Sequence, residues 1–137
     1  MSRKASFSIL LNFVLLILLV SCSGGNQEDV LAGDAISRGK ALYEKTLVGA
    51  KMAPGCVTCH SLEPGTKLVG PSLAGISSTA GSAVPEMTAE QFLREAIVNP
   101  DAHVEEGFVE GIMYRGYGED LTEEELNDLV AFLMTLK

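Results

Sequence analysis

Two cysteines and a histidine lie close together near the middle of the chain, in the sequence Cys56-Val57-Thr58-Cys59-His60. A C-x-x-C pair in an exported protein serves as a disulfide, a redox couple, half of a zinc site or the attachment point of a haem. The histidine directly after Cys59 favours haem. Two thiols at this spacing add to the two vinyl groups, and the histidine then lies under the iron. The sequence therefore predicts one covalently attached haem c, bound by Cys56, Cys59 and His60.

Two of the other uses of the cysteine pair find little support. A zinc site needs further Cys or His ligands at suitable spacing, and His103 is the only other histidine. A thioredoxin-like redox pair is expected within a βαβ pattern, and no such pattern is visible around Cys56. Haem attachment remains the favoured chemistry of the motif.

The first 21 residues have the pattern of a cleaved signal peptide. Arg3 and Lys4 precede the nearly continuous apolar run Ile9–Val20. This run is too short for an ordinary membrane span, which needs about 20 residues. It ends in Leu19-Val20-Ser21-Cys22, which resembles the lipobox of bacterial lipoproteins. The resemblance implies cleavage before Cys22 and attachment of membrane lipid to that cysteine.

Two further segments follow the predicted signal peptide. Residues 22–33 are mostly small and polar, and we expect them to form a lipid-anchored, flexible tether. Residues 34–137 are long enough for one domain. The lipid would hold this domain on the exported face of a bacterial membrane, periplasmic or extracellular. We expect the cytoplasmic membrane, because respiratory partners lie there.

The charge of the chain excludes one class of partner. The sequence has 10 basic and 18 acidic residues, a net charge of −8, whereas binding of nucleic acid requires a basic face. The acidic residues concentrate in residues 86–128, which hold thirteen acidic and two basic side chains. This half is either a solvated surface or a docking face for a basic partner.

Helix signals occur at three places along the chain. Asp34 is a candidate N-cap for a helix over residues 35–45. Thr88 begins a capping box before a helix over residues 92–98. Thr122 begins a second capping box before a C-terminal helix. That last helix carries apolar residues at helical spacing, namely Leu126, Leu129, Val130, Leu133 and Leu136.

The remaining segments predict long loops rather than strands. Residues 48–55 contain Pro54 and Gly55, and residues 61–85 are rich in Gly, Pro and Ser. An irregular stretch of that length is unusual in a small domain unless it wraps a ligand, and a haem would supply the missing apolar core. No alternating strand pattern is present. We therefore predict an all-α fold with three to four helices and long loops.

Residues 34–137 resemble the class I cytochromes c. The resemblance rests on Gly39 and Tyr43 in the first helix, the Cys56–His60 motif, Gly70-Pro71-Ser72-Leu73, Met113 and the closing helix. It implies the small class I fold around one haem, which transfers single electrons and catalyses no bond chemistry. The lipidated monohaem subunit of alternative complex III is similar. The implied partners are redox proteins or a membrane electron-transfer complex.

The resemblance also implies roles for individual residues. The carbonyl of Pro71 would accept a hydrogen bond from His60 Nδ1, and Leu73 would pack on the haem. Gly39 would let the first helix cross closely over the last. In the usual family pattern a proline follows the distal methionine, whereas Tyr114 follows Met113 here.

Four side chains are candidates for the sixth iron ligand, namely Met52, Met87, His103 and Met113. Met113 lies in the late loop where the family places its ligand, and we favour it. A thioether is a neutral, soft ligand that raises the reduction potential relative to two histidines. The chain would then be a tethered shuttle or a fixed subunit. The alternative is an open-site haem enzyme or gas sensor, for which His103 is the only distal acid–base group.

Overall fold

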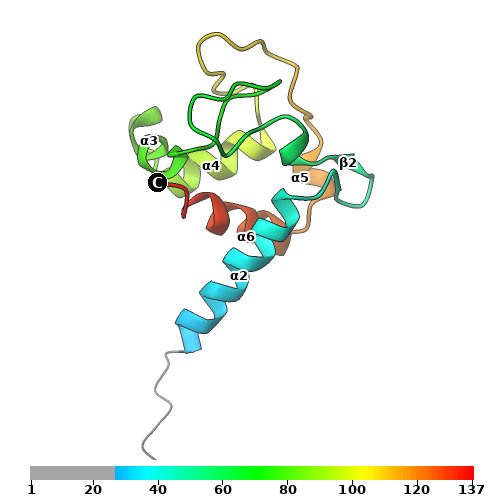
Figure 1. Ribbon diagram of the computed structural model, residues 1–137, viewed down its shortest axis with the longest axis vertical. Helices are drawn as coiled ribbons and strands as arrows, with labels where there is room; N and C mark the ends of the chain where they lie inside the picture. Colours follow the sequence, from blue (N-terminus) through cyan, green and yellow to red (C-terminus); the bar gives the residue numbers. More distant parts are fainter. Residues whose placement is uncertain (1–26) are drawn as a thin grey trace, which may run out of the picture. The chain divides into compact units, whose positions relative to one another are not determined.

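The computed structural model describes residues 27–137 (Figure 1). The predicted signal peptide and the lipidation of Cys22 lie outside the described residues. The described elements are α2 (Gln27–Tyr43), β1 (Leu47–Val48), β2 (Ala53–Pro54), a 3-10 turn (Cys56–Thr58), α3 (Ile76–Ala83), α4 (Ala89–Val98), α5 (Tyr117–Asp120) and α6 (Glu123–Leu133). Among these residues the only strands are two short ones, so the all-α class is confirmed. None of the described helices combines the length and the apolar character of a membrane span.

The first helix differs from its prediction at both ends. Helix α2 runs from Gln27 to Tyr43, so residues 27–33 of the expected tether are helical. Asp34 is inside the helix and does not cap it. The residues before Asp34 include good helix formers, and one glycine at position 33 costs about 1 kcal/mol without ending a helix. The predicted helix start at Asp34 was therefore wrong, because a single Asp before apolar residues does not by itself define an N-cap.

Helix α3 lies within the stretch that was expected to be irregular. Its sequence, ISSTAGSA, has little helix propensity of its own. Tertiary contacts support it instead, because Ala80 is fully buried and the backbone NH and hydroxyl of Ser77 both donate to the Leu136 carbonyl. With the one-turn α5, the described residues contain five α-helices rather than three or four. The segment expected to be a loop before the cysteine motif contains a small hairpin, in which Leu47 pairs with Pro54 and Val48 with Ala53.

Both predicted capping boxes are confirmed. Thr88 caps α4 and Thr122 caps α6, and each accepts from the backbone NH three residues later. Helix α6 ends at Leu133, so Leu136 lies beyond the helix although it still packs on the core. Since caps act within a single turn, their positions follow from the local sequence.

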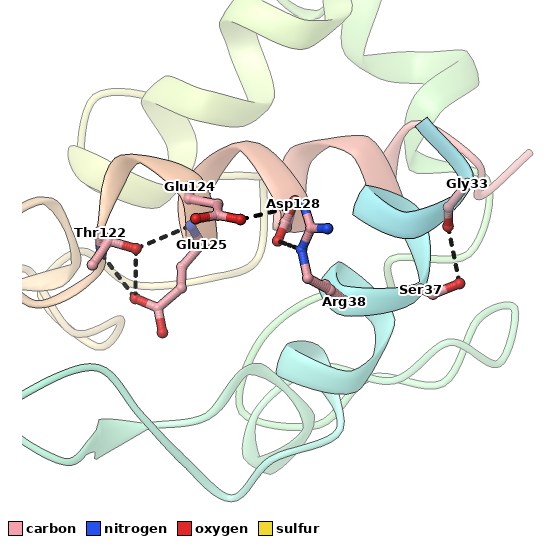
Figure 2. Close-up of polar contacts among 7 residues, drawn as sticks. All are labelled: Gly33, Ser37, Arg38, Thr122, Glu124, Glu125 and Asp128. Atoms are coloured by element: carbon pink, nitrogen blue, oxygen red, sulfur yellow. Dashed lines mark hydrogen bonds and ion pairs between the residues drawn. The ribbon is translucent and has the colours of Figure 1, made fainter. Parts of the chain in front are cut away.

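Helix α6 provides the centre of the core and crosses α2. Five of its apolar side chains are buried, namely Leu126, Leu129, Val130, Phe132 and Leu133. Gly39 lies at the crossing, where a Cβ would be 2.5 Å from the Asp128 carbonyl carbon and 2.9 Å from Phe132 Cβ. Beside this contact Arg38 donates to both carboxylate oxygens of Asp128, at 2.6 and 2.7 Å (Figure 2). The expected close crossing of the first and last helices is therefore present.

Candidate functional site

A partly open cavity of about 670 Å³ is lined by α4, α6, the loops around the cysteine motif and the loop between α4 and α5. This volume falls within the roughly 300–1,000 Å³ of typical cofactor sites. Most of the residues that line it are apolar. All six side chains predicted for the haem site line this one cavity, namely Cys56, Cys59, His60, Pro71, Leu73 and Met113.

The 3-10 turn brings the two thiols and the imidazole together. His60 N donates to the Cys56 carbonyl at 2.9 Å, and Cys59 N donates to the same carbonyl at 3.1 Å. The two cysteines form no disulfide with each other. In the chain without a bound group, burial raises the pKa of the Cys56 thiol to about 11. Within the described residues no group of three or more His, Cys, Asp or Glu is arranged to hold a metal ion.

Contacts to both the side chain and the backbone hold His60 in place. Its Nδ1 lies 2.9 Å from the Pro71 carbonyl. A carbonyl can only accept, so Nδ1 carries the proton and the Nε2 lone pair is available to a metal. Burial lowers the pKa of His60 and favours this neutral form. Tyr43 donates to the His60 carbonyl at 2.7 Å, and Gly70 leaves room for the ring, since a Cβ there would lie 2.5 Å from His60 Cε1.

The four candidate distal ligands lie in different surroundings. Met113 is half-buried and lines the cavity. Met52 is 64% exposed in the turn between β1 and β2, and neither Met52 nor Met87 is among the lining residues. Met113 is thus the only one of the three methionines that reaches the site.

His103, another candidate for the sixth ligand, also lines the cavity. It is half-buried, and its Nε2 lies 3.0 Å from Glu95 Oε2. Its ring centroid lies 5.6 Å from that of Phe92. One of the two ring nitrogens of His103 is therefore already paired with a carboxylate.

A second group of residues at this site was not found by sequence reasoning. Asp101 accepts from Gly111 N at 2.7 Å and pairs with Arg115, which ties the residues on either side of Met113 to one carboxylate. The hydrogen bond from Gly111, and then Arg115, holds the pKa of Asp101 below its usual value. Neither contact has a sequence signature, because the partners are ten or more residues apart and meet only when the loop folds back on itself.

Comparison with known proteins adds one match. Residues 36–137 match the protein-family model described as cytochrome c. The match covers most of the chain and includes every residue described around the cavity. No curated protein matches the chain significantly.

Proposed function

The chain belongs to the cytochrome c family, and from this premise we propose that His60 and Met113 ligate its haem iron and that it serves a bacterial respiratory or photosynthetic chain. The family binds covalently attached haem c and carries electrons to and from redox partners, rather than acting as a typical enzyme. The bound haem supplies a one-electron couple. The chain supplies the attachment, the two ligands and the surroundings that tune them.

The single observation that carries the ligand assignment is the set of donors facing one cavity. Two thiols, the imidazole of His60 and the thioether of Met113 line it together, whereas Nε2 of His103, the other imidazole there, is paired with Glu95. Cys56 and Cys59 would form the two thioether links, and His60 would ligate through Nε2. Met113 would supply the second protein ligand of the iron through its thioether sulfur. The His60 ring lies directly against Gly70, where any side chain would displace it. This placement of the ring is consistent with the proposed ligation.

The proposed ligands determine what the site can do. The Pro71 carbonyl orients His60 and raises its basicity through the hydrogen bond at Nδ1. A thioether from Met113 favours the reduced state and raises the potential. Because His60 and Met113 would both bind the iron, no position would be left for a substrate, and the bound haem would transfer electrons without bond chemistry.

We further infer that the protein works as a fixed subunit of a membrane complex similar to alternative complex III. The support is the lipoprotein-like N-terminus together with the acidic half of the chain, whose residues 86–128 offer a surface for a basic neighbour. A free shuttle would instead bury less than about 1,200 Å² with each partner. The two arrangements differ in how binding responds to salt, because exposed charges are screened beyond about 10 Å at 0.1 M.

A haem-stained native gel of gently solubilised membranes distinguishes the subunit from the shuttle. We expect the haem band of this chain to migrate with a complex far larger than its own 14.5 kDa, and to remain there after a high-salt wash. Soluble cytoplasmic proteins from the same cells are the control for nonspecific comigration. A band near the mass of the chain alone, or one released by salt, would show that the protein is a shuttle.

Replacing Cys22 with serine tests the proposed lipid anchor. The variant is expected to lose label from radioactive fatty acid and to move from the membrane to the soluble fraction when expressed without its partners. The reason is that two or more acyl chains hold a protein stably, whereas without them little binding remains. Ser23→Ala, next to the modified position, is the matched control and should stay with the membrane. Unchanged labelling of Cys22→Ser would contradict lipidation at this residue.

A further inference from the structure

A buried carboxylate lies behind the loop that carries Met113. The side chain of Asp120, at the end of α5, is 0% exposed, although an ionised carboxylate is costly to bury without partners. Its Oδ2 accepts a hydrogen bond of 2.6 Å from the Tyr114 hydroxyl, and its Oδ1 lies 2.9 Å from Lys51 Nζ. The carboxylate therefore joins the turn between β1 and β2 to the residue that follows Met113.

The partners of Asp120 keep this network intact around neutral pH. The hydrogen bond from Tyr114, and then Lys51, lowers the pKa of the Asp120 carboxyl. Glu119 is the other charged group here, 3.2 Å from Lys51 Nζ. The Asp120 carboxylate is thus charged at neutral pH and keeps both of its partners.

Further contacts hold the hairpin against α5, which lies beside β2 in Figure 1. Ala50 N donates to the Asp120 carbonyl at 3.0 Å. Tyr117 donates to the Pro54 carbonyl at 2.5 Å. A Cβ at Gly49, where φ is +70°, would lie 2.7 Å from the Asp120 carbonyl oxygen. The hairpin that leads to the cysteine motif is therefore a fixed base for the network.

The network acts on the residue next to Met113. The ring of Tyr114 packs edge-on against Tyr117, with centroids 5.1 Å apart, and lies so close to Gly116 that a Cβ there would overlap it. Met113 and Tyr114 both line the cavity. Because the two are joined by one peptide bond, fixing the Tyr114 side chain limits where the thioether can lie.

We propose that Tyr114, Asp120 and Lys51 position Met113 on the iron and thereby set how readily external ligands displace it. This rests on the proposed ligation by Met113. When the network is cut, the thioether leaves the iron in a larger fraction of molecules. An external ligand then binds more tightly. Its apparent dissociation constant equals the intrinsic constant divided by the fraction of molecules whose iron is free to bind it, so the apparent constant falls as that fraction rises.

Titration of the ferric holoprotein with imidazole reports the fraction of molecules in which the Met113 thioether has left the iron. Tyr114→Phe removes only the hydroxyl and is expected to lower the dissociation constant about tenfold, because hydrogen bonds to charged groups are among the stronger ones. The near-infrared sulfur-to-iron absorption should weaken in parallel. Lys51→Gln changes a side chain that is 60% exposed, so it should fold. It is expected to act in the same direction with a smaller change.

Arg38→Gln is the matched control, because Arg38 pairs with the other buried carboxylate, that of Asp128 (Figure 2). Neither of these residues lines the cavity. The control should unfold more easily yet bind imidazole within about twofold of the wild type. If Tyr114→Phe and Lys51→Gln also bind imidazole like the wild type while Met113→Ala binds it more tightly, the network is merely structural and the proposal fails. If Met113→Ala binds imidazole no more tightly than the wild type, Met113 is not the ligand, and both the proposed ligation and the positioning role of the network are wrong.

Discussion

Replacement of Met113 by alanine is expected to abolish the near-infrared sulfur-to-iron absorption and to lower the reduction potential by more than about 60 mV. The threshold corresponds to a tenfold change in a one-electron equilibrium, within the roughly 0.8 V range over which axial ligands act. The potential falls because water or hydroxide would replace a soft, neutral thioether that favours the reduced state. A spectroelectrochemical titration of the purified holoprotein measures both quantities.

Met52→Ala is the control for the loss of a methionine. Met52 is exposed and lies away from the cavity, so its removal should leave the absorption and the potential unchanged. The ferrous wild-type protein should also exclude carbon monoxide, whereas Met113→Ala should bind it rapidly. Survival of the absorption in Met113→Ala would exclude this ligand. Rapid binding by the wild type would favour the open-site alternative, in which His103 is the distal group.

The parts of the site that could be predicted from the sequence are those set by local spacing. The turn from Cys56 to His60 closes through hydrogen bonds within five residues, so its geometry follows from the motif. Thr88 and Thr122 cap their helices within a single turn for the same reason. The bond between His60 and Pro71 was expected only through the family resemblance, and the structure contains it.

The features that could not be predicted depend on partners distant in sequence. Helix α3 forms from residues of low helix propensity because Ala80 and Ser77 find contacts on other elements. Pairing of Asp120 with Lys51 depends on how the hairpin packs against α5. The position of His103 in the cavity follows from the path of the loop after α4. No local pattern encodes these contacts, so sequence periodicity could not indicate them.

Replacement of Gly39 by alanine is expected to destabilise the protein by about 3 kcal/mol or more, measured as the free energy of unfolding in urea. The added methyl group would overlap the Asp128 carbonyl oxygen and lie 2.9 Å from Phe132 Cβ. Overpacking of a core typically costs about 1–3 kcal/mol. The cost here lies at the upper end or beyond it, because the obstacle is a backbone carbonyl that cannot rotate away.

Gly33→Ala separates the effect of the helix crossing from the effect of helix propensity. Gly33 belongs to the same helix, and a Cβ there would meet nothing within 4 Å. Its replacement should stabilise the protein by up to about 1 kcal/mol, because alanine favours helix over glycine. The two glycines therefore predict changes of opposite sign from the same substitution. If Gly39→Ala unfolded at the same urea concentration as the wild type, α2 could not cross α6 at this point. The packing of Tyr43 against Phe132 would then need another explanation, as would the hydrogen bond from Tyr43 to the His60 carbonyl, since α2 positions Tyr43 for both.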